Sequence, residues 1–276
     1  MMKNKFQQVV IFAFICVCCS QTLSPIKVHF VEGNKELFFY GSAHDNNIAN
    51  PMFADIEESF KRFTPDVVLI EGGYSNRSYS TKEQAIGDGE MAFVSFLGSS
   101  ASIPMFDIEP SGMFVDSILL SQFSSNLIFT MYILRQTFQY QSKAQNNDID
   151  FIKEIENYAN YIIANGRFDF EDSLKFEDIF RTVESETDIA ITRENWFDKR
   201  IEVRRYLYNR RNVVKNQVQI VHSRVVDIRD EYATSLIMDK LEEYNKVFVI
   251  MGNQHLLNQE NILREELRNR FRFQNP

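Results

Sequence analysis

Residues 65–73 read PDVVLIEGG, and this stretch decides the fold. Its centre, residues 67–70, is a continuous apolar run between Pro65 and the turn-forming pair Gly72-Gly73. A strand without polar alternation is buried on both faces, which is typical of a parallel sheet covered by helices. The run therefore predicts an α/β protein with a mixed, largely parallel central sheet that is flanked by helices.

Segments on either side repeat this alternation of strand and helix. Turn residues and apolar patterning predict strands at residues 26–31, 36–40, 67–70, 103–108 and 246–251. Apolar residues at helical spacing predict helices at residues 50–63, 91–97 and 262–271. Strands that alternate with helices form a sheet with right-handed crossovers, so the order along the chain supports the same fold class.

The middle of the chain, residues 113–241, is predicted to be mostly helical. Breaks are expected near Asn146-Asn147 and Asn165-Gly166. No linker rich in Pro, Gly or Ser separates this region from the strands. We therefore expect residues 21–276 to form a single domain, with the helical middle as an insertion or cap over the sheet.

The first twenty residues differ from the rest in composition. Lys3 and Lys5 precede an apolar run at residues 9–19, and Ser20 follows it. This layout predicts a signal peptide at residues 1–20, because the run is about half of the ~20 residues that cross a bilayer. The protein is then exported, as a periplasmic, secreted or envelope-associated protein.

The cysteines and the charge exclude several functions. All three cysteines, Cys16, Cys18 and Cys19, lie in the predicted signal peptide, so the mature chain would have no thiol chemistry. Lipidation of one of them is the alternative, and contact with a membrane is expected only in that case. The chain carries a formal net charge of −8, which disfavours nucleic acid. A small-molecule or peptide substrate is the expected partner.

Polar residues with catalytic potential follow the predicted strands. His44 and His255 each come three residues after a glycine at a strand end, and Glu71 and Glu109 directly follow strands. Ligands of open α/β sheets bind beyond the carboxyl ends of the strands. We therefore expect these four side chains to point into one crevice, although each alone is as well explained by a loop or a turn.

One arginine breaks the pattern of its helix. Arg229 lies on the same predicted helix face as Val225, Tyr232 and Leu236. A buried guanidinium needs a carboxylate or an anionic ligand, unless its head reaches water. Glu90 is interpreted as a helix-dipole residue without function, and His29 and His222 as structural.

Residues 38–44, 66–73 and 229–256 together resemble the TraB/TIKI superfamily, which is related to the erythromycin-esterase and ChaN-like haem-binding folds. The resemblance implies a site made of His44, His255 and Glu71, with Arg229 as a partner for an anion or a carboxylate. Gly89-Glu90 and Glu109-Pro110 are similar to further acidic positions of the esterase-like branch. The chain departs from the family in having Asn258 where a glycine is usual, and Asp230 after Arg229 where an asparagine is common.

The resemblance implies three alternative chemistries. In the first, His44 and His255 together with Glu71, or alternatively Glu109, bind a divalent metal ion that activates water, with Glu71, Glu109 and Arg229 as catalytic residues. In the second, a histidine is the general base without a metal, Glu71 orients it and Arg229 stabilises negative charge. In the third, the protein binds haem or another ligand, or is a dead enzyme kept as a binding module.

The first of these, an exported metal-dependent hydrolase, is the leading expectation. The sequence contains neither an HExxH motif nor a Gly-x-Ser-x-Gly elbow, which excludes zincins and the usual serine hydrolases.

Overall fold

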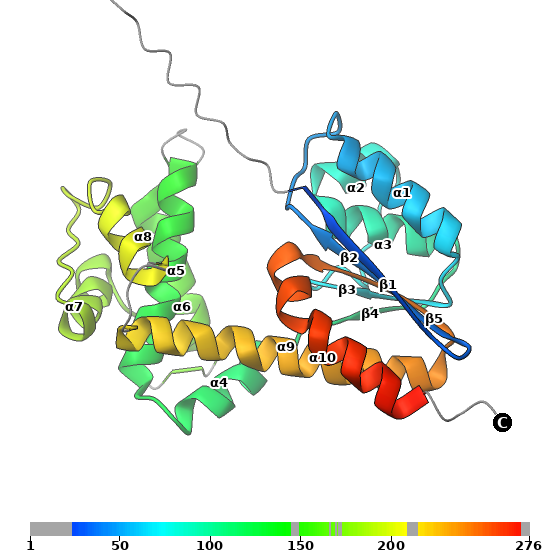
Figure 1. Cartoon of the computed structure of the whole chain (residues 1–276). Coiled ribbons are helices and arrows are strands. Elements are labelled where there is room, and N and C mark those ends of the chain that lie inside the picture. The colour runs from blue at the N-terminus through cyan, green and yellow to red at the C-terminus, as the bar shows by residue number, and fades with distance from the viewer. Residues whose placement is uncertain are drawn as a thin grey trace, which may run out of the picture.

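The computed structural model describes residues 24–144, 149–165, 167–168, 170, 173–208 and 215–271. The predicted signal peptide, with its three cysteines, lies outside these ranges. The described chain folds into a lobe that contains the sheet and a lobe made of helices (Figure 1).

The described residues form five strands in one sheet, as the sequence predicts. They are β1 (Ile26–Glu32), β2 (Lys35–Ser42), β3 (Val67–Ile70), β4 (Met105–Asp107) and β5 (Lys246–Gly252). Their order is β1-β2-β5-β3-β4. β1 pairs antiparallel with β2, and the other neighbours pair in parallel. The last strand of the chain, β5, is therefore the central one.

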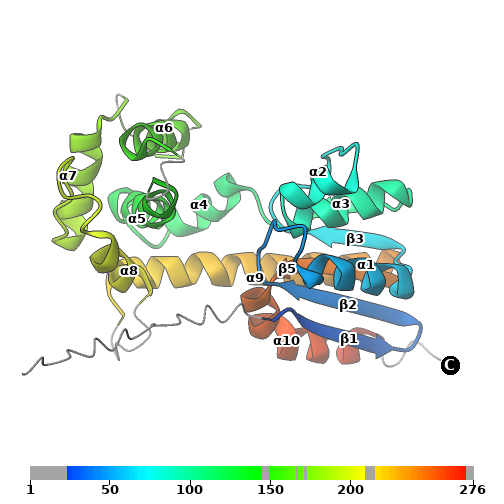
Figure 2. The same ribbon diagram turned by 90° about the horizontal axis from the view of Figure 1, so that it is seen from above.

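Helices cover both faces of the sheet. The helices α1 (Pro51–Phe63), α2 (Lys82–Gly87) and α3 (Glu90–Ser100) lie on one face, and α10 (Asn253–Phe271) and part of α9 (Gln217–Glu243) lie on the other (Figures 1 and 2). Phe248 and Ile250 pack toward α1 and α3, whereas Val247 and Val249 pack toward α9 and α10. Because successive side chains of β5 point to opposite faces and all are apolar, the strand is buried on both sides.

The helical lobe has a core of its own. It consists of α4 (Gly112–Leu120), α5 (Ser125–Ala144), α6 (Phe151–Ala164), α7 (Phe176–Thr187), α8 (Arg200–Tyr208) and the first half of α9. The predicted helical character of this region is confirmed. The lobe lies beyond the carboxyl ends of the strands rather than over a sheet face, because its helices bury their apolar sides against one another (Figure 2).

A single helix, α9, belongs to both lobes. Val225 and Ile228 are buried in the core of the helical lobe, and Ala233 and Ile237 are buried against the sheet. Arg229 and Asp230 lie between these two groups, where the helix passes from one core to the other. The predicted inward position of Tyr232 is wrong, since its side chain is 36% exposed.

Helix α10 starts earlier than the sequence suggests. It begins at Asn253, directly after β5, instead of at residue 262. Leu256, Gln259 and Leu263 are buried at helical spacing, and the polar residues around them concealed this pattern. His255 therefore lies in the first turn of a helix and not in a loop.

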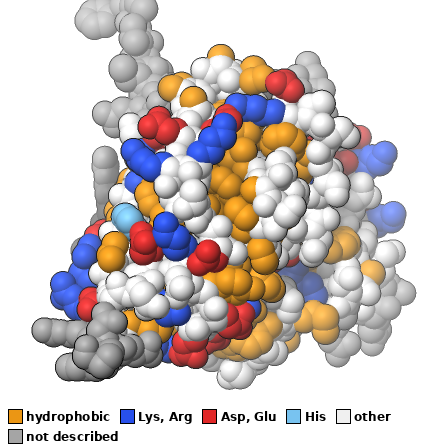
Figure 3. All heavy atoms as spheres, turned by 90° about the vertical axis from the view of Figure 1, so that its right-hand side faces the viewer, with side chains coloured by type: hydrophobic (Ala, Val, Ile, Leu, Met, Phe, Trp, Pro, Cys, Tyr) orange, Lys and Arg blue, Asp and Glu red, His pale blue; other side chains and the backbone are white. Residues whose placement is uncertain are grey.

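The face at the other ends of the strands shows acidic and basic side chains around a band of apolar ones (Figure 3). Within the described segments, no helix has both the length and the apolar character needed to span a bilayer.

Candidate active site

The strand register brings the predicted site residues to one edge of the sheet. Ser42 pairs with Gly252, and Ile70 pairs with both Ile250 and Asp107. The strands β2, β5, β3 and β4 therefore end together, as expected for parallel neighbours. His44, Glu71 and Glu109 follow these ends in irregular chain, and His255 follows in α10.

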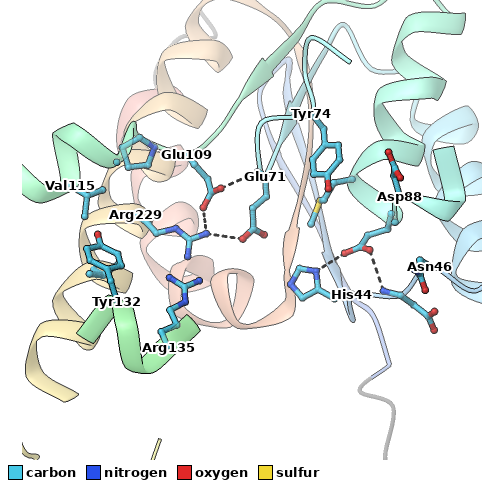
Figure 4. A pocket seen from close by; sticks show the side chains of 18 of the residues that line it. His44, Asn46, Glu71, Tyr74, Asp88, Glu109, Val115, Tyr132, Arg135 and Arg229 are labelled. Carbon is cyan, nitrogen blue, oxygen red and sulfur yellow. Dashed lines mark hydrogen bonds and ion pairs between the residues drawn. The ribbon is translucent and has the colours of Figure 1, made fainter. Parts of the chain in front are cut away.

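A pocket of about 640 Å³ lies at this edge, between the two lobes. Among the predicted site residues, His44, Glu71, Glu109 and Arg229 line it (Figure 4). The sheet-containing lobe also contributes Asp45, Asn46, Tyr74, Asp88, Glu90 and Met91. The helical side contributes Val115, Tyr132, Arg135, Arg167 and Val225. The volume is in the range of small-molecule sites, which is about 300–1,000 Å³.

His44 forms a dyad with Glu90. Its Nδ1 lies 2.7 Å from Glu90 Oε1, which also accepts a hydrogen bond of 2.7 Å from Ser42 Oγ. The Glu90 side chain is 4% exposed, whereas that of His44 is 64% exposed. A buried carboxylate thus fixes one nitrogen of a ring that is open to solvent, and the other nitrogen, Nε2, is free for chemistry.

The dyad changes the acidity of both groups. The hydrogen bond to Glu90 raises the pKa of His44 above 6.5, and the negative charge of Glu90 adds to this effect. Burial alone would raise the pKa of Glu90, but hydrogen bonds from His44 and Ser42 outweigh burial and lower it. Glu90 is therefore an anion that stabilises the protonated imidazole, which is the partner that a general base requires.

The backbone around His44 is adapted to this position. His44 has a φ of 54°, in the left-handed region that non-glycine residues rarely adopt. A Cβ added at Gly252 would lie 2.7 Å from His44 Nε2 and 3.7 Å from Glu71 Oε2. Glycine at the end of β5 therefore leaves the space that the imidazole occupies beside Glu71.

A second group of charges lies on the other side of Glu71. Arg229 Nη2 donates to Glu71 Oε1 at 2.8 Å and also to Glu109 Oε1. Backbone N–H groups hold the remaining oxygens, from Gly252 to Glu71 Oε2 at 2.7 Å and from Gly72 to Glu109 Oε2 at 3.0 Å. Burial alone would raise the pKa of Glu71. The charges of His255 and Arg229 and the hydrogen bond from the Gly252 N–H outweigh burial and lower this pKa, so Glu71 is an anion. The predicted need of Arg229 for a carboxylate is confirmed.

His255 lies behind Glu71 and is not among the residues that line the pocket. Its Nε2 is 3.6 Å from Glu71 Oε1, and its Nδ1 is 2.5 Å from Asp230 Oδ1. Asp230 also accepts hydrogen bonds from Asn258 at 2.8 Å and from Gln259 at 3.0 Å. The two departures from the family pattern, Asp230 and Asn258, thus bind each other and orient His255.

The residues predicted to hold a metal ion do not form a metal site as they are placed. The oxygens of Glu71 already accept from Arg229 and Gly252, and a guanidinium beside them repels a cation. Among the described residues, no group of three or more His, Cys, Asp or Glu side chains is arranged to hold an ion. The divalent metal ion remains a prediction.

The roles of two pocket residues were not predicted from sequence. Glu90 was matched to an acidic position of the esterase-like branch and otherwise assigned to the helix dipole, although the residues after it, 91–94, are all apolar and thereby signal its burial. Arg135 follows a similar apolar run at residues 131–134 and faces the pocket from α5 (Figure 4). The residues interpreted as structural behave so: His29 lies 3.0 Å from Glu36, and His222 packs edge-on against Tyr208.

Comparison with known proteins leaves the site to be interpreted from its geometry. No family model, curated protein or solved structure matches the chain. The resemblance to the TraB/TIKI superfamily therefore rests on the sequence motifs alone.

Proposed function

We propose that the protein is a hydrolase in which His44 and Glu90 activate a water molecule without a metal ion. The observation that carries this proposal is the dyad itself: a buried carboxylate 2.7 Å from Nδ1 of a histidine that lines a pocket. This corresponds to the metal-independent alternative from sequence, with Glu90 in place of Glu71 as the residue that orients the histidine. The substrate is a small molecule or a peptide with an ester or amide bond.

The reaction follows from the protonation states of the dyad. His44 Nε2 accepts a proton from water while the water oxygen attacks the carbonyl carbon of the substrate. Glu90 stabilises the imidazolium that forms, through the hydrogen bond at Nδ1. Collapse of the tetrahedral intermediate breaks the bond to the leaving group, which takes the proton back from Nε2.

Arg229 donates hydrogen bonds to the oxyanion of the transition state from guanidinium N–H groups other than those of Nη2, which Glu71 and Glu109 hold. It lines the pocket, and its side chain is 15% exposed, so its field is weakly screened by solvent. Glu71 and Glu109 hold the guanidinium through Nη2. In this proposal the two glutamates position Arg229 rather than react.

Substitution of the dyad tests the proposal. Hydrolysis of 4-nitrophenyl hexanoate is measured for the wild type, His44→Gln and Glu90→Gln, with melting temperature as the check on folding. We expect His44→Gln to lower kcat/KM about a hundredfold or more, in the range of general-base catalysis, and Glu90→Gln to lower it less. Equal kcat/KM values in a folded His44→Gln variant would falsify the proposal.

Export is also a proposal. The amino-acid pattern of residues 3–20 is its only support. Sequencing the N-terminus of the mature protein tests it: a start near residue 21 supports export, and an intact Met1 contradicts it.

A further inference from the structure

Among the described residues, three arginines line the pocket, and two of them are neutralised by carboxylates. Arg229 is held by Glu71 and Glu109. Arg167 is held by Asp116, to which it donates from both Nε and Nη2. The third, Arg135 on α5, forms no ion pair or hydrogen bond with any residue that the structure describes. It is half-buried, so its charge is only partly compensated by water.

The surroundings of Arg135 offer it no counter-charge. Three titratable groups that its charge influences are Tyr158, Tyr208 and His222, from α6, α8 and α9. Burial raises the pKa of both tyrosines, and burial together with Arg135 and Lys215 lowers the pKa of His222 to about 4. All three are uncharged at neutral pH. Arg135 thus stands among neutral groups, on the pocket side of its helix (Figure 4).

Asp116, the carboxylate of α4 at the helical wall, is already bound to other groups. Asp116 Oδ1 accepts from Tyr132 at 2.9 Å and from Arg167 Nη2 at 3.0 Å, and Oδ2 accepts from Arg167 Nε. The Arg167 guanidinium also lies over the Tyr132 ring, 4.6 Å from its centre. This network pairs Asp116 with Arg167 and Tyr132, and no hydrogen bond or ion pair joins Asp116 to Arg135.

The two walls of the pocket therefore differ in charge. The sheet-side wall carries carboxylates, including Asp45, Asp88 and Glu90, whereas the helical wall carries Arg135 next to the apolar Val115 and Val225. A ligand that spans the pocket from His44 gains most by placing an anionic group at the helical wall. One unpaired guanidinium in an otherwise acidic pocket matches one negative charge, a carboxylate, better than a doubly charged phosphate.

We propose that Arg135 is the binding site for a carboxylate of the substrate, so that the pocket takes acids whose scissile ester or amide bond reaches His44. The placement of the scissile bond rests on the proposed hydrolase function. The carboxylate site does not, because it concerns binding alone.

Equilibrium binding tests the site without catalysis. Titration calorimetry compares 4-phenylbutanoate with 4-phenylbutanamide, which has nearly the same shape and no charge. We expect the wild type to bind the acid about ten- to a hundredfold more tightly, as for a hydrogen bond to a charged group of about 1.5–3 kcal/mol. Arg135→Gln should abolish this preference and Arg135→Lys should keep part of it. Arg205→Gln, which removes an exposed arginine of α8 outside the pocket, should leave it unchanged.

Hydrolysis separates the two proposals. The substrates are the 4-nitrophenyl monoester of adipic acid and 4-nitrophenyl hexanoate, which differ in a terminal carboxylate or methyl group. We expect Arg135→Gln to raise KM for the adipate ester about ten- to a hundredfold and to change KM for the hexanoate ester much less. Carboxylate-selective binding without hydrolysis of either ester would contradict the hydrolase and keep the Arg135 site. Hydrolysis without any effect of Arg135→Gln on carboxylate preference, in a folded variant, would overturn the Arg135 site.

Discussion

At the scale of single residues, His44 combines a strained backbone with a specific hydrogen bond. A non-glycine residue in the left-handed region costs on the order of 1–3 kcal/mol, and such residues gather at functional sites. The bonds from His44 and Ser42 to the buried Glu90 hold this conformation. The strain is explained if the position of the imidazole matters more than local stability.

The raised pKa of His44 makes a prediction about pH. A general base must be neutral, so kcat/KM should fall as pH drops through the pKa of His44, which lies above 6.5. Glu90→Gln removes the main cause of the raised pKa and should move this acidic limb to lower pH while the maximum rate decreases. The measurement is kcat/KM for 4-nitrophenyl hexanoate between pH 5 and 9, the window around a histidine pKa.

The stability that the dyad provides should change with pH in the opposite direction. A pKa raised in the folded state stabilises the protein below the unfolded pKa, and this contribution is lost as pH rises through the folded pKa. For the activity measurement, an acidic limb of kcat/KM that does not move in Glu90→Gln would mean that a group other than His44 is the base.

The absence of a side chain at Gly252 leaves room for the His44 imidazole, and this can be tested by substitution. In Gly252→Ala the new Cβ would lie 2.7 Å from His44 Nε2, and the imidazole must move because the backbone of β5 is fixed in the sheet centre. The ring is largely exposed, so it can turn away at little cost. We expect a loss of kcat/KM of at least about tenfold, as for misplaced catalytic groups, and a melting temperature within a few degrees of wild type. Gly87→Ala is the control, because nothing lies within 4 Å of a Cβ at that position. A Gly252→Ala enzyme with wild-type kcat/KM would show that catalysis does not require His44 Nε2 at its position beside Gly252.

At the scale of elements, Arg229 ties α9 to the ends of β3 and β4. Its partners Glu71 and Glu109 follow these two strands, and the exposed fractions of the three side chains are 15%, 13% and 23%. The guanidinium thus joins a helix of the helical lobe to the sheet through largely buried charges.

Removal of this guanidinium should be costly. Arg229→Gln leaves two partly buried carboxylates unpaired, and we expect a loss of about 3–5 kcal/mol in the free energy of unfolding. The triple variant Arg229→Gln, Glu71→Gln, Glu109→Gln removes those charges and should recover much of the loss. Urea denaturation at pH 7 measures both. A triple variant less stable than Arg229→Gln would mean that the carboxylates stabilise the fold independently of Arg229.

The strands, their ends and most helices could be predicted from sequence, whereas the start of α10 and the hydrogen-bond partners of the site residues could not. Continuous apolar runs mark β3 and β5 because burial on both faces leaves no room for polar side chains, and the residues after them must share an edge. His255 shows the limit: the residues that begin α10 are mostly polar, and burial of Gln259 depends on a bond to Asp230 that is remote in sequence. The role of Glu90 likewise depends on Ser42 and His44, far away along the chain.

At the scale of the whole molecule, one helix joins two hydrophobic cores. The helical core and the sheet core share α9, and the pocket lies where they meet. The arrangement explains why the middle of the chain carries no catalytic motif of its own. Apart from Arg229, its contribution to the site is a wall with Arg135 and Tyr132 that lines the pocket opposite His44.

The prediction of a single domain can be tested through these cores. Ile179→Ala in the helical lobe and Ile250→Ala in the sheet each remove a fully buried side chain and should cost about 2–5 kcal/mol. If α9 couples the lobes, both variants lower the temperature of one common calorimetric transition. Ile201→Ala, at a side chain that is 63% exposed, should change it little. Two transitions, each shifted by only one of the variants, would show that the lobes unfold independently.

The central claim is that His44 activates water without a metal ion. The most direct test is the rate of 4-nitrophenyl hexanoate hydrolysis by protein dialysed against a chelator, with metal content measured on the same sample. We predict that the stripped wild type keeps its kcat/KM and that stripped, folded His44→Gln loses about a hundredfold or more. Loss of wild-type activity on stripping, with recovery when a divalent ion is added, would contradict the claim and restore the metal site of His44, His255 and Glu71.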